Sequence, residues 1–235
     1  MTISNDPPAF FKDIFREELI RSGGEHAFGL LSLEEEISRM RFYLKTLEEF
    51  IESQRRSEIE QLEQQAKNLT KEQQSQFWAW YYPVHWHEIF ASRLRSSFLI
   101  SLVSFTELHL NQLCRDVAVI TNSALKSSDF KGSVLECSKK FLDNFGKFTK
   151  PSKEDWELIT CIHYVRNIIV HNNGSISQKA NRLKQFINEH PALSEMHDFV
   201  KLEKDFCFFS LDTIFAFLKS LQSEVRELCE RIKKH

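Results

Sequence analysis

The sequence predicts an all-α fold. Glycine and proline are scarce, with 6 and 5 copies in 235 residues, whereas residues that favour helices are abundant, which is typical of long helices joined by few turns. Apolar residues recur every three or four positions along most of the chain, as in helices buried on one face. Several of the 21 phenylalanines follow this spacing, as Phe206, Phe209 and Phe217 do, so we expect the phenylalanines to fill helix interfaces. A chain of this length buries a full core, and we expect one continuous domain.

The N-terminal part, residues 1–76, is expected to contribute two helices. Residues 8–21 have amphipathic spacing, and Ser22-Gly23-Gly24 ends that helix. A longer helix is expected over residues 33–68, because Ser32 and Glu35 form a capping-box pattern and no helix breaker follows.

Beyond Ile51 the surface becomes polar on most sides, so residues 52–76 are expected to form a long, glutamine-rich polar helix. This helix either protrudes from the core or packs on a partner chain. A solvated helix that touches nothing explains the composition equally well.

Residues 77–87 contain three of the four tryptophans, and Pro83 breaks the helix there. We expect these aromatic residues to attach a helix junction to the core, and stacking on nucleobases is the alternative. His85 and His87 are two positions apart and have no third ligand in the pattern, so a metal site is rejected and no cofactor is expected.

A further helix is expected over residues 88–123. Its predicted buried stripe consists of Leu94, Phe98, Leu102, Phe105, Leu108 and Leu113. Its predicted polar side consists of Arg93, Arg95, Ser96, Ser97, Ser101, Ser104, Thr106 and Glu107.

Shorter elements follow. Residues 132–145 are expected to form a helix ended by Gly146, and residues 147–152 a loop. Ser152 resembles an N-cap, and the helix that it opens is expected to end at or just beyond His171, where Asn172, Asn173 and Gly174 tolerate left-handed backbone.

The C-terminal part is expected to contain two more helices. They cover residues 175–189, up to the breaker His190-Pro191, and residues 210–234. A short extended segment is expected within residues 197–209. Residues 77–235 together are expected to form a helical bundle.

Composition limits the function classes. The formal net charge of −2 gives no general attraction to a polyanion, so a nucleic-acid interaction has to rest on a local site. The lysine-rich residues 126–153 are equally well explained as a solvated helix face. Five widely spaced cysteines and the absence of a leader or long apolar run predict reduced thiols in a soluble, cytoplasmic protein without membrane contact.

One segment carries groups suited to chemistry, namely Arg166-Asn167-Ile168-Ile169-Val170-His171. RNA cleavage without a metal needs proton transfer at the 2′-hydroxyl and at the leaving 5′-oxygen, and it needs neutralisation of phosphorane charge. His171 can transfer protons near neutral pH, and the planar fork of Arg166 can bind phosphate oxygens.

Helical geometry constrains this pair. Five residues turn a helix by about 500°, so Arg166 and His171 would lie about 140° apart on a straight helix. Asn167 and His171 share a face, which places Asn167 to orient the imidazole or to bind phosphate. Arg166 and His171 therefore meet only if the helix unwinds at its end or if a second copy of the chain completes the site. The simplest alternative is an interfacial Arg and a His that complements the helix dipole.

The stretch from Val165 to Gly174 resembles the Arg-x4-6-His motif of the HEPN superfamily, in which a polar residue usually follows the Arg. The upstream segments Arg93-Leu94-Arg95-Ser96-Ser97-Phe98-Leu99 and Phe105-Thr106-Glu107-Leu108 are similar to the long helix that precedes the motif helix in many such proteins. The resemblance covers roughly residues 88–234.

The resemblance implies a helical bundle, a homodimer that joins two motif helices, and RNA cleavage that leaves a cyclic phosphate and a 5′-hydroxyl. Arg166 and His171 match the catalytic pair and Asn167 the polar position. Glu107 and Asn172 are weaker candidates for substrate contacts. Such proteins often act as toxins or in antiviral defence, so an antitoxin or a defence-system protein is an expected partner.

Two other functions are compatible with the sequence. The first is a catalytically inactive HEPN-like dimer that scaffolds or senses a partner protein. The second is a coiled-coil adaptor built on residues 33–68, although the heptad pattern there is short and irregular.

Overall fold

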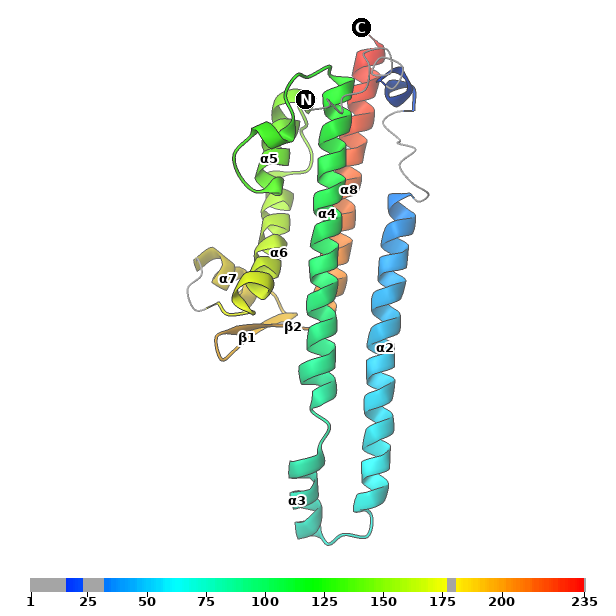
Figure 1. The fold of residues 1–235 in the computed structure, drawn as a ribbon, viewed down its shortest axis with the longest axis vertical. Helices are drawn as coiled ribbons and strands as arrows, with labels where there is room; N and C mark the ends of the chain where they lie inside the picture. Colours follow the sequence, from blue (N-terminus) through cyan, green and yellow to red (C-terminus); the bar gives the residue numbers. More distant parts are fainter. Residues whose placement is uncertain (1–15, 23–31, 177–180, 235) are drawn as a thin grey trace, which may run out of the picture. The chain divides into compact units, whose positions relative to one another are not determined.

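The computed structural model describes residues 16–22, 32–176 and 181–234 and confirms an all-α fold with one small β-hairpin (Figure 1). The helices are α2 (Leu33–Ala66), α3 (Lys71–Tyr81), α4 (Ser92–Ile120), α5 (Val134–Phe141), α6 (Lys153–Asn172), α7 (Asn181–Glu189) and α8 (Lys204–Lys233), and the strands are β1 (Leu193–Met196) and β2 (Phe199–Leu202). Two π-helical turns, Trp86–Ala91 and Leu142–Gly146, lie before α4 and after α5, and a short 3-10 turn covers Ser127–Asp129. Residues 16–21 are helical, and the rest of the helix predicted for residues 8–21 lies outside the described residues.

The chain forms two compact units, each built from segments distant in the sequence. Unit 1 is drawn from Met1–Glu34, Leu102–His163 and Asp212–His235, and unit 2 from Glu35–Ser101 and Tyr164–Leu211. The division falls inside α2, α4, α6 and α8. The sequence boundary between residues 76 and 77 falls inside α3.

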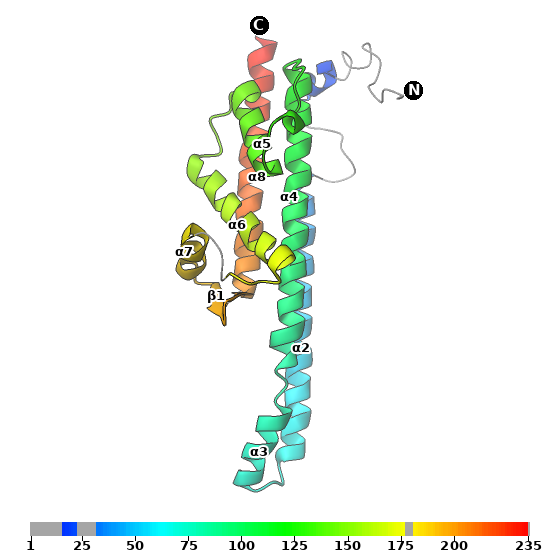
Figure 2. The same cartoon turned by 60° about the vertical axis from the view of Figure 1, so that its left-hand side comes forward.

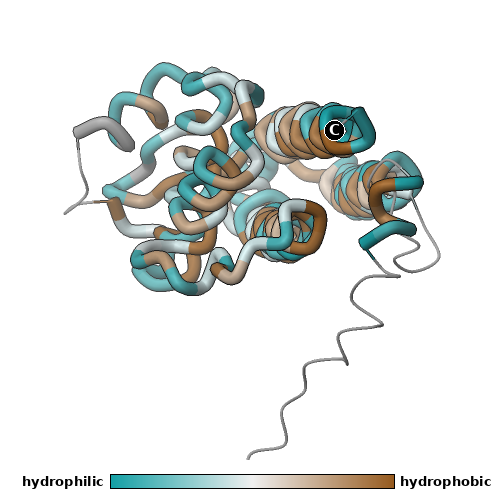
Figure 3. The backbone as a smooth tube through the Cα atoms, turned by 90° about the horizontal axis from the view of Figure 1, so that it is seen from above, coloured by the Kyte–Doolittle hydropathy of each residue, from teal (hydrophilic) through white to brown (hydrophobic). Residues whose placement is uncertain are grey.

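The core of unit 1 is formed by the apolar faces of its helices. Apolar residues recur every three or four positions along α8, and Figure 3 shows them alternating with hydrophilic residues along this helix, which carries the C label. Trp156 of α6 meets Phe217 of α8 edge-on, with ring centroids 4.8 Å apart. The buried carboxylate of Glu224 accepts hydrogen bonds from the backbone N–H and the hydroxyl of Thr149, both at 3.1 Å, so the loop before α6 is tied to α8.

Unit 2 contains all but the first two residues of α2 and, beside the end of that helix, α3 (Figures 1 and 2). The prediction that residues 52–76 form one polar helix is wrong, because α2 ends at Ala66 and α3 begins at Lys71. Thr70 caps α3: its hydroxyl accepts from the backbone N–H of Gln73, and the Gln73 side chain accepts from the N–H of Thr70. The Thr70-to-Gln73 spacing is itself a capping-box pattern, so the interruption could have been predicted.

The aromatic residues 77–87 do not form core. No residue of α3 is buried, and Trp80 is 83% exposed. The expectation that this cluster attaches a junction to the core is therefore wrong for α3. Trp86 is the better attached member, since its Nε1 donates to Glu58 of α2 at 2.6 Å.

Two predicted faces of α4 need correction. Leu108, predicted to be buried, is 66% exposed, whereas Arg95 and Thr106, predicted on the polar side, are buried. The hydroxyl of Thr106 donates to the carbonyl of Leu102 one turn earlier, so its hydrogen-bonding requirement is met within α4 itself. The buried side of α4 therefore includes these two polar residues. Three members of the predicted stripe are buried as expected, namely Phe98, Leu102 and Leu113.

The C-terminal part also differs in detail. Ser175 forms a β-bridge with Phe199 and does not begin a helix, while α7 covers Asn181–Glu189 and ends before His190-Pro191 as predicted. The extended segment is a hairpin over residues 193–202, and α8 begins at Lys204, six residues before the predicted start. Among the described residues, none of the helices combines the length and apolar character that crossing a bilayer requires.

Candidate functional site

The motif lies on α6, and local signals set both ends of that helix. The hydroxyl of Ser152 accepts from the N–H of Asp155, and the Asp155 carboxylate accepts from the N–H of Ser152, as the sequence predicts for an N-cap. The helix continues to Asn172. Asn173 and Gly174 then have φ values of 50° and 88°, so the left-handed exit predicted from Asn and Gly is confirmed.

Arg166 and Asn167 contact each other. Nη1 of Arg166 donates to Oδ1 of Asn167 at 2.9 Å, and both side chains are half-buried. The Nε of Arg166 is buried and has no hydrogen-bond partner among the described residues. Asn167 thus orients the guanidinium through Nη1. The Nε–H group of Arg166 remains available to donate a hydrogen bond, as far as the described residues show.

His171 is exposed in the last turn of α6. Because α6 stays helical through Asn172, the unwinding that would bring His171 round to Arg166 does not occur. Residues five apart remain about 140° apart around the axis. Tyr164, Asn167 and His171 share a face instead, at positions i, i+3 and i+7.

The two weaker candidates lie in different units. Asn172 belongs to unit 2 and is half-buried, and its carbonyl accepts from the backbone N–H of Ser175 at 2.9 Å. Glu107 belongs to unit 1, where its Oε1 lies 3.8 Å from Nδ1 of the buried His163. His163 is a residue that the motif pattern does not single out.

The hairpin adjoins the exit of α6. The N–H of Ile176 donates to the carbonyl of Asp198 at 2.8 Å, and the N–H of Val200 donates to the carbonyl of Gly174 at 2.9 Å. The turn residues His197 and Asp198 both have positive φ, as in the two-residue turns that connect tight hairpins. The sequence signal was weak, since such turns favour Asn-Gly or Asp-Gly.

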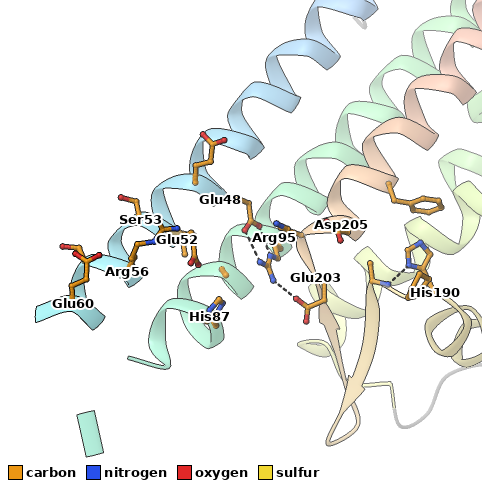
Figure 4. A pocket seen from close by; sticks show the side chains of 18 residues that line it. Glu48, Glu52, Ser53, Arg56, Glu60, His87, Arg95, His190, Glu203 and Asp205 are labelled. Carbon is orange, nitrogen blue, oxygen red and sulfur yellow. Dashed lines mark hydrogen bonds and ion pairs between the residues drawn. The ribbon is translucent and has the colours of Figure 1, made fainter. Parts of the chain in front are cut away.

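A second candidate site is a cavity of about 1380 Å³ in unit 2, lined by α2, the start of α4 and the segments flanking the hairpin (Figure 4). The buried Arg95 stands in its wall, and its guanidinium binds both carboxylate oxygens of Glu48, at 2.8 and 3.0 Å. Nη1 also donates to Glu203 at 3.2 Å and to the carbonyl of Leu202 at 3.1 Å. Burial lowers the pKa of Arg95, but the hydrogen bonds and charge of Glu48, with the charge of Glu203, raise it overall above its ordinary value.

Charge argues against phosphate binding in this cavity. Carboxylates outnumber basic side chains in its lining, and Arg95 is already neutralised by two of them. His190 has a structural role, because its Nδ1 accepts from the N–H of Ala192 and its ring packs on Phe206 and Phe209. Burial lowers the pKa of His190, which is consistent with a neutral acceptor nitrogen.

Thiol and metal chemistry find little support in the described residues. All five cysteines are buried free thiols, and burial raises the pKa of Cys114 to about 11 and that of Cys207 to about 12, which disfavours the reactive thiolate. Across the described ranges, His, Cys, Asp and Glu side chains do not gather in groups of three or more that could hold a metal ion.

Comparisons leave the family open: no family model matches the chain, and neither the curated proteins nor the solved structures contain a match.

Proposed function

We propose that this chain is a HEPN-type endoribonuclease that cleaves RNA without a metal ion. In this proposal it acts in the cytoplasm as a homodimeric toxin or antiviral-defence effector, controlled by a partner protein. Arg166, Asn167 and His171 form the reactive group, and Asn172 and Glu107 are candidate contacts to substrate.

The observation that carries the proposal is the state of Arg166. A buried guanidinium nitrogen that lacks a partner costs free energy, of the order of 1–3 kcal/mol for a typical buried donor. Asn167 accepts one hydrogen bond from Nη1, and Nε has no partner in the described chain. An arginine that is oriented yet unsatisfied is suited to bind an anion such as phosphate.

His171 supplies proton transfer. It is exposed at the end of α6, so a substrate can reach it. In the proposed reaction the 2′-oxygen attacks the adjacent phosphorus as its proton passes to a neutral imidazole. The bond from phosphorus to the 5′-oxygen breaks, and an imidazolium protonates that oxygen. The products are a 2′,3′-cyclic phosphate and a 5′-hydroxyl, and Arg166 offsets the charge of the phosphorane.

A second copy completes the site in this proposal. The regular geometry of α6 keeps Arg166 and His171 on different sides of one helix. Two copies related by a two-fold axis can place His171 of each chain near Arg166 of the other. Where the two motif helices meet at the axis, both imidazoles also reach one phosphate, one as the base and the other as the acid.

The test is cleavage of mixed RNAs by purified protein in EDTA, with analysis of the product ends. His171→Ala is expected to lower kcat by about 10²–10⁴-fold, because it removes proton transfer. Arg166→Ala is expected to lower kcat and to raise KM, because it removes both phosphate binding and charge stabilisation. Asn167→Ala should give a smaller loss, since it removes an orienting group.

Matched controls are His87→Ala and Arg93→Ala, which remove an exposed imidazole and an exposed guanidinium outside the motif. Both should cut RNA at the wild-type rate. Cleavage by His171→Ala at the wild-type rate would refute the enzyme proposal, as would products that carry a 3′-hydroxyl.

The alternative function, a catalytically inactive HEPN-like scaffold, is favoured by a different observation. Large apolar side chains are exposed in unit 2 outside the motif, including Trp80, Tyr81 and Ile89 at 83%, 60% and 56%. Exposed apolar clusters commonly mark interaction surfaces. An RNA-inactive protein that still forms a dimer would support this alternative.

A further inference from the structure

The β-hairpin is fixed to the chain three residues beyond His171. Backbone hydrogen bonds join Ile176 to Asp198 and Val200 to Gly174, and Ser175 forms a β-bridge with Phe199. The segment leaving α6 therefore lies beside the start of β2, joined to it by an isolated β-bridge. Since these bonds are short, at 2.8 and 2.9 Å, the start of β2 is held next to the motif.

Phe199 is the residue of β2 that this arrangement brings closest to the exit of α6. A methyl group placed on Gly174 would lie 3.7 Å from Cδ1 of the Phe199 ring, so the ring lies against this glycine. Gly174 has a φ of 88°, a conformation that other residues rarely adopt. The ring of Phe199 thus contacts the chain three residues after His171.

The outer face of the hairpin is open. Side chains alternate along β2: Leu202 is buried and Val200 half-buried, whereas Phe199 is 46% exposed and Lys201 is exposed. Phe199 and Lys201 lie on the same face, roughly 7 Å apart along the strand. Lys201 pairs with Glu203 at 3.0 Å, but both side chains are more than two-fifths exposed, and such surface pairs are weak enough to exchange.

We propose that Phe199 is a base-stacking platform, so that the substrate is RNA that is single-stranded next to the scissile phosphate. This inference rests on the proposed ribonuclease activity. An aromatic ring half-open to solvent binds the face of an unpaired base, whereas the bases of a duplex are stacked on each other and offer no free face. Lys201, on the same face, binds a neighbouring phosphate of the strand.

Location distinguishes Phe199 from the other exposed aromatic residues. Single exposed apolar side chains are common and need no function. Trp80 and Tyr81 lie on α3, which carries none of the motif residues. Phe199 instead lies beside a helix end that carries Arg166 and His171.

The experiment measures kcat and KM on a short RNA whose cleavage site lies in an unpaired segment. Phe199→Ala is expected to raise KM roughly 5- to 150-fold, because stacking of one base on an aromatic ring contributes about 1–3 kcal/mol, while kcat changes little. Phe199→Tyr should restore the wild-type KM. Annealing a complementary strand across the site should suppress cleavage by the wild type. Tyr43→Ala, which removes an exposed aromatic ring of α2, is the matched control and should leave KM unchanged.

A binding assay separates this inference from the activity itself. In the His171→Ala protein, RNA with 2-aminopurine next to the cleavage site should lose fluorescence on binding, because the analogue stacks on the ring, and adding Phe199→Ala should abolish that quenching. If the wild type cleaves RNA but Phe199→Ala keeps the wild-type KM, the stacking platform is refuted while the activity stands. A KM defect that disappears at high protein concentration would identify Phe199 as a dimer contact and would also refute the inference. Wild-type cleavage by His171→Ala would instead remove the proposed function on which it rests.

Discussion

Asp116 of α4 is a carboxylate enclosed in the core of unit 1. It is 4% exposed, and Nε2 of Gln112 donates to its Oδ1 at 2.7 Å. Burial raises the pKa of Asp116 to about 7, and the hydrogen bond from Gln112 and the charge of Arg115 offset only part of this effect. The folded protein therefore holds a proton on Asp116 over a pH range in which the unfolded chain releases it.

The sign of the pH dependence follows directly. The stabilising contribution of the protonated carboxyl is complete below the unfolded pKa of 3.8 and is lost as pH rises through the folded pKa of about 7. Asp116→Asn keeps the acceptor for Gln112 without the ionisable group. We expect this variant to be more stable than the wild type at pH 8 by roughly 1–3 kcal/mol, with a smaller difference at pH 4.5. Urea unfolding at the two pH values measures this.

The control for this prediction is Asp143→Asn, at an exposed position of the π-helical turn Leu142–Gly146. An exposed carboxyl keeps its hydration on folding, so the change should stay within about 0.5 kcal/mol at both pH values. An effect of Asp116→Asn that is the same at pH 4.5 and pH 8 would contradict a protonated Asp116 in the folded protein.

At the scale of elements, α3 and α5 both begin with a capping box but differ in how much of each helix is buried. Thr70 with Gln73 and Ser133 with Glu136 both form capping boxes. No residue of α3 is buried, whereas α5 buries several residues, including Leu135 and Phe141. The same loss of a cap should therefore have different consequences in the two helices.

We expect Thr70→Ala to affect α3 alone. Loss of an N-cap costs about 1 kcal/mol, and a helix without buried residues can fray without opening a core. Amide hydrogen exchange of residues 71–81 should accelerate about fivefold, while Tm stays within about 1 °C of the wild type. Ser133→Ala, which removes an equivalent cap from a packed helix, should lower Tm by about 2–4 °C. Equal Tm losses in the two variants would show that α3 is coupled to the core.

At the scale of the whole molecule, the proposed site depends on association. Tyr164 is 50% exposed and shares a face of α6 with Asn167 and His171. An apolar side chain beside the reactive groups is suited to contact the same helix of a second copy. Oligomeric state and cleavage should therefore change together.

Tyr164→Glu is expected to weaken the dimer at least about tenfold, because in the proposed dimer two carboxylates would meet across the two-fold axis in place of two aromatic rings. Light scattering at micromolar concentration should show monomer, and cleavage should fall in parallel. Tyr81→Glu places the same charge on an equally open aromatic position of α3, which is 60% exposed, and should change neither property. A wild type that is monomeric and cleaves RNA would contradict a composite site.

The sequence by itself determined the all-α class, the ends of α6 and the position of the motif on that helix, because their signals are local. Helical periodicity, the N-cap of α6 and the left-handed exit at Asn173 and Gly174 each depend on residues within a few positions of one another. The motif pair was identified for the same reason, since spacing along one helix fixes the angle between Arg166 and His171.

Tertiary structure alone decided which side chains are buried and what lies beside the motif. The buried Arg95 looked like a solvent-facing charge, yet its partners Glu48 and Glu203 are 47 and 108 positions away in the chain. Phe199 reaches the exit of α6 through a β-bridge, and Trp80 and Tyr81 of α3 stay exposed because no described element covers them. These outcomes depend on contacts between distant segments, which no local window of sequence contains.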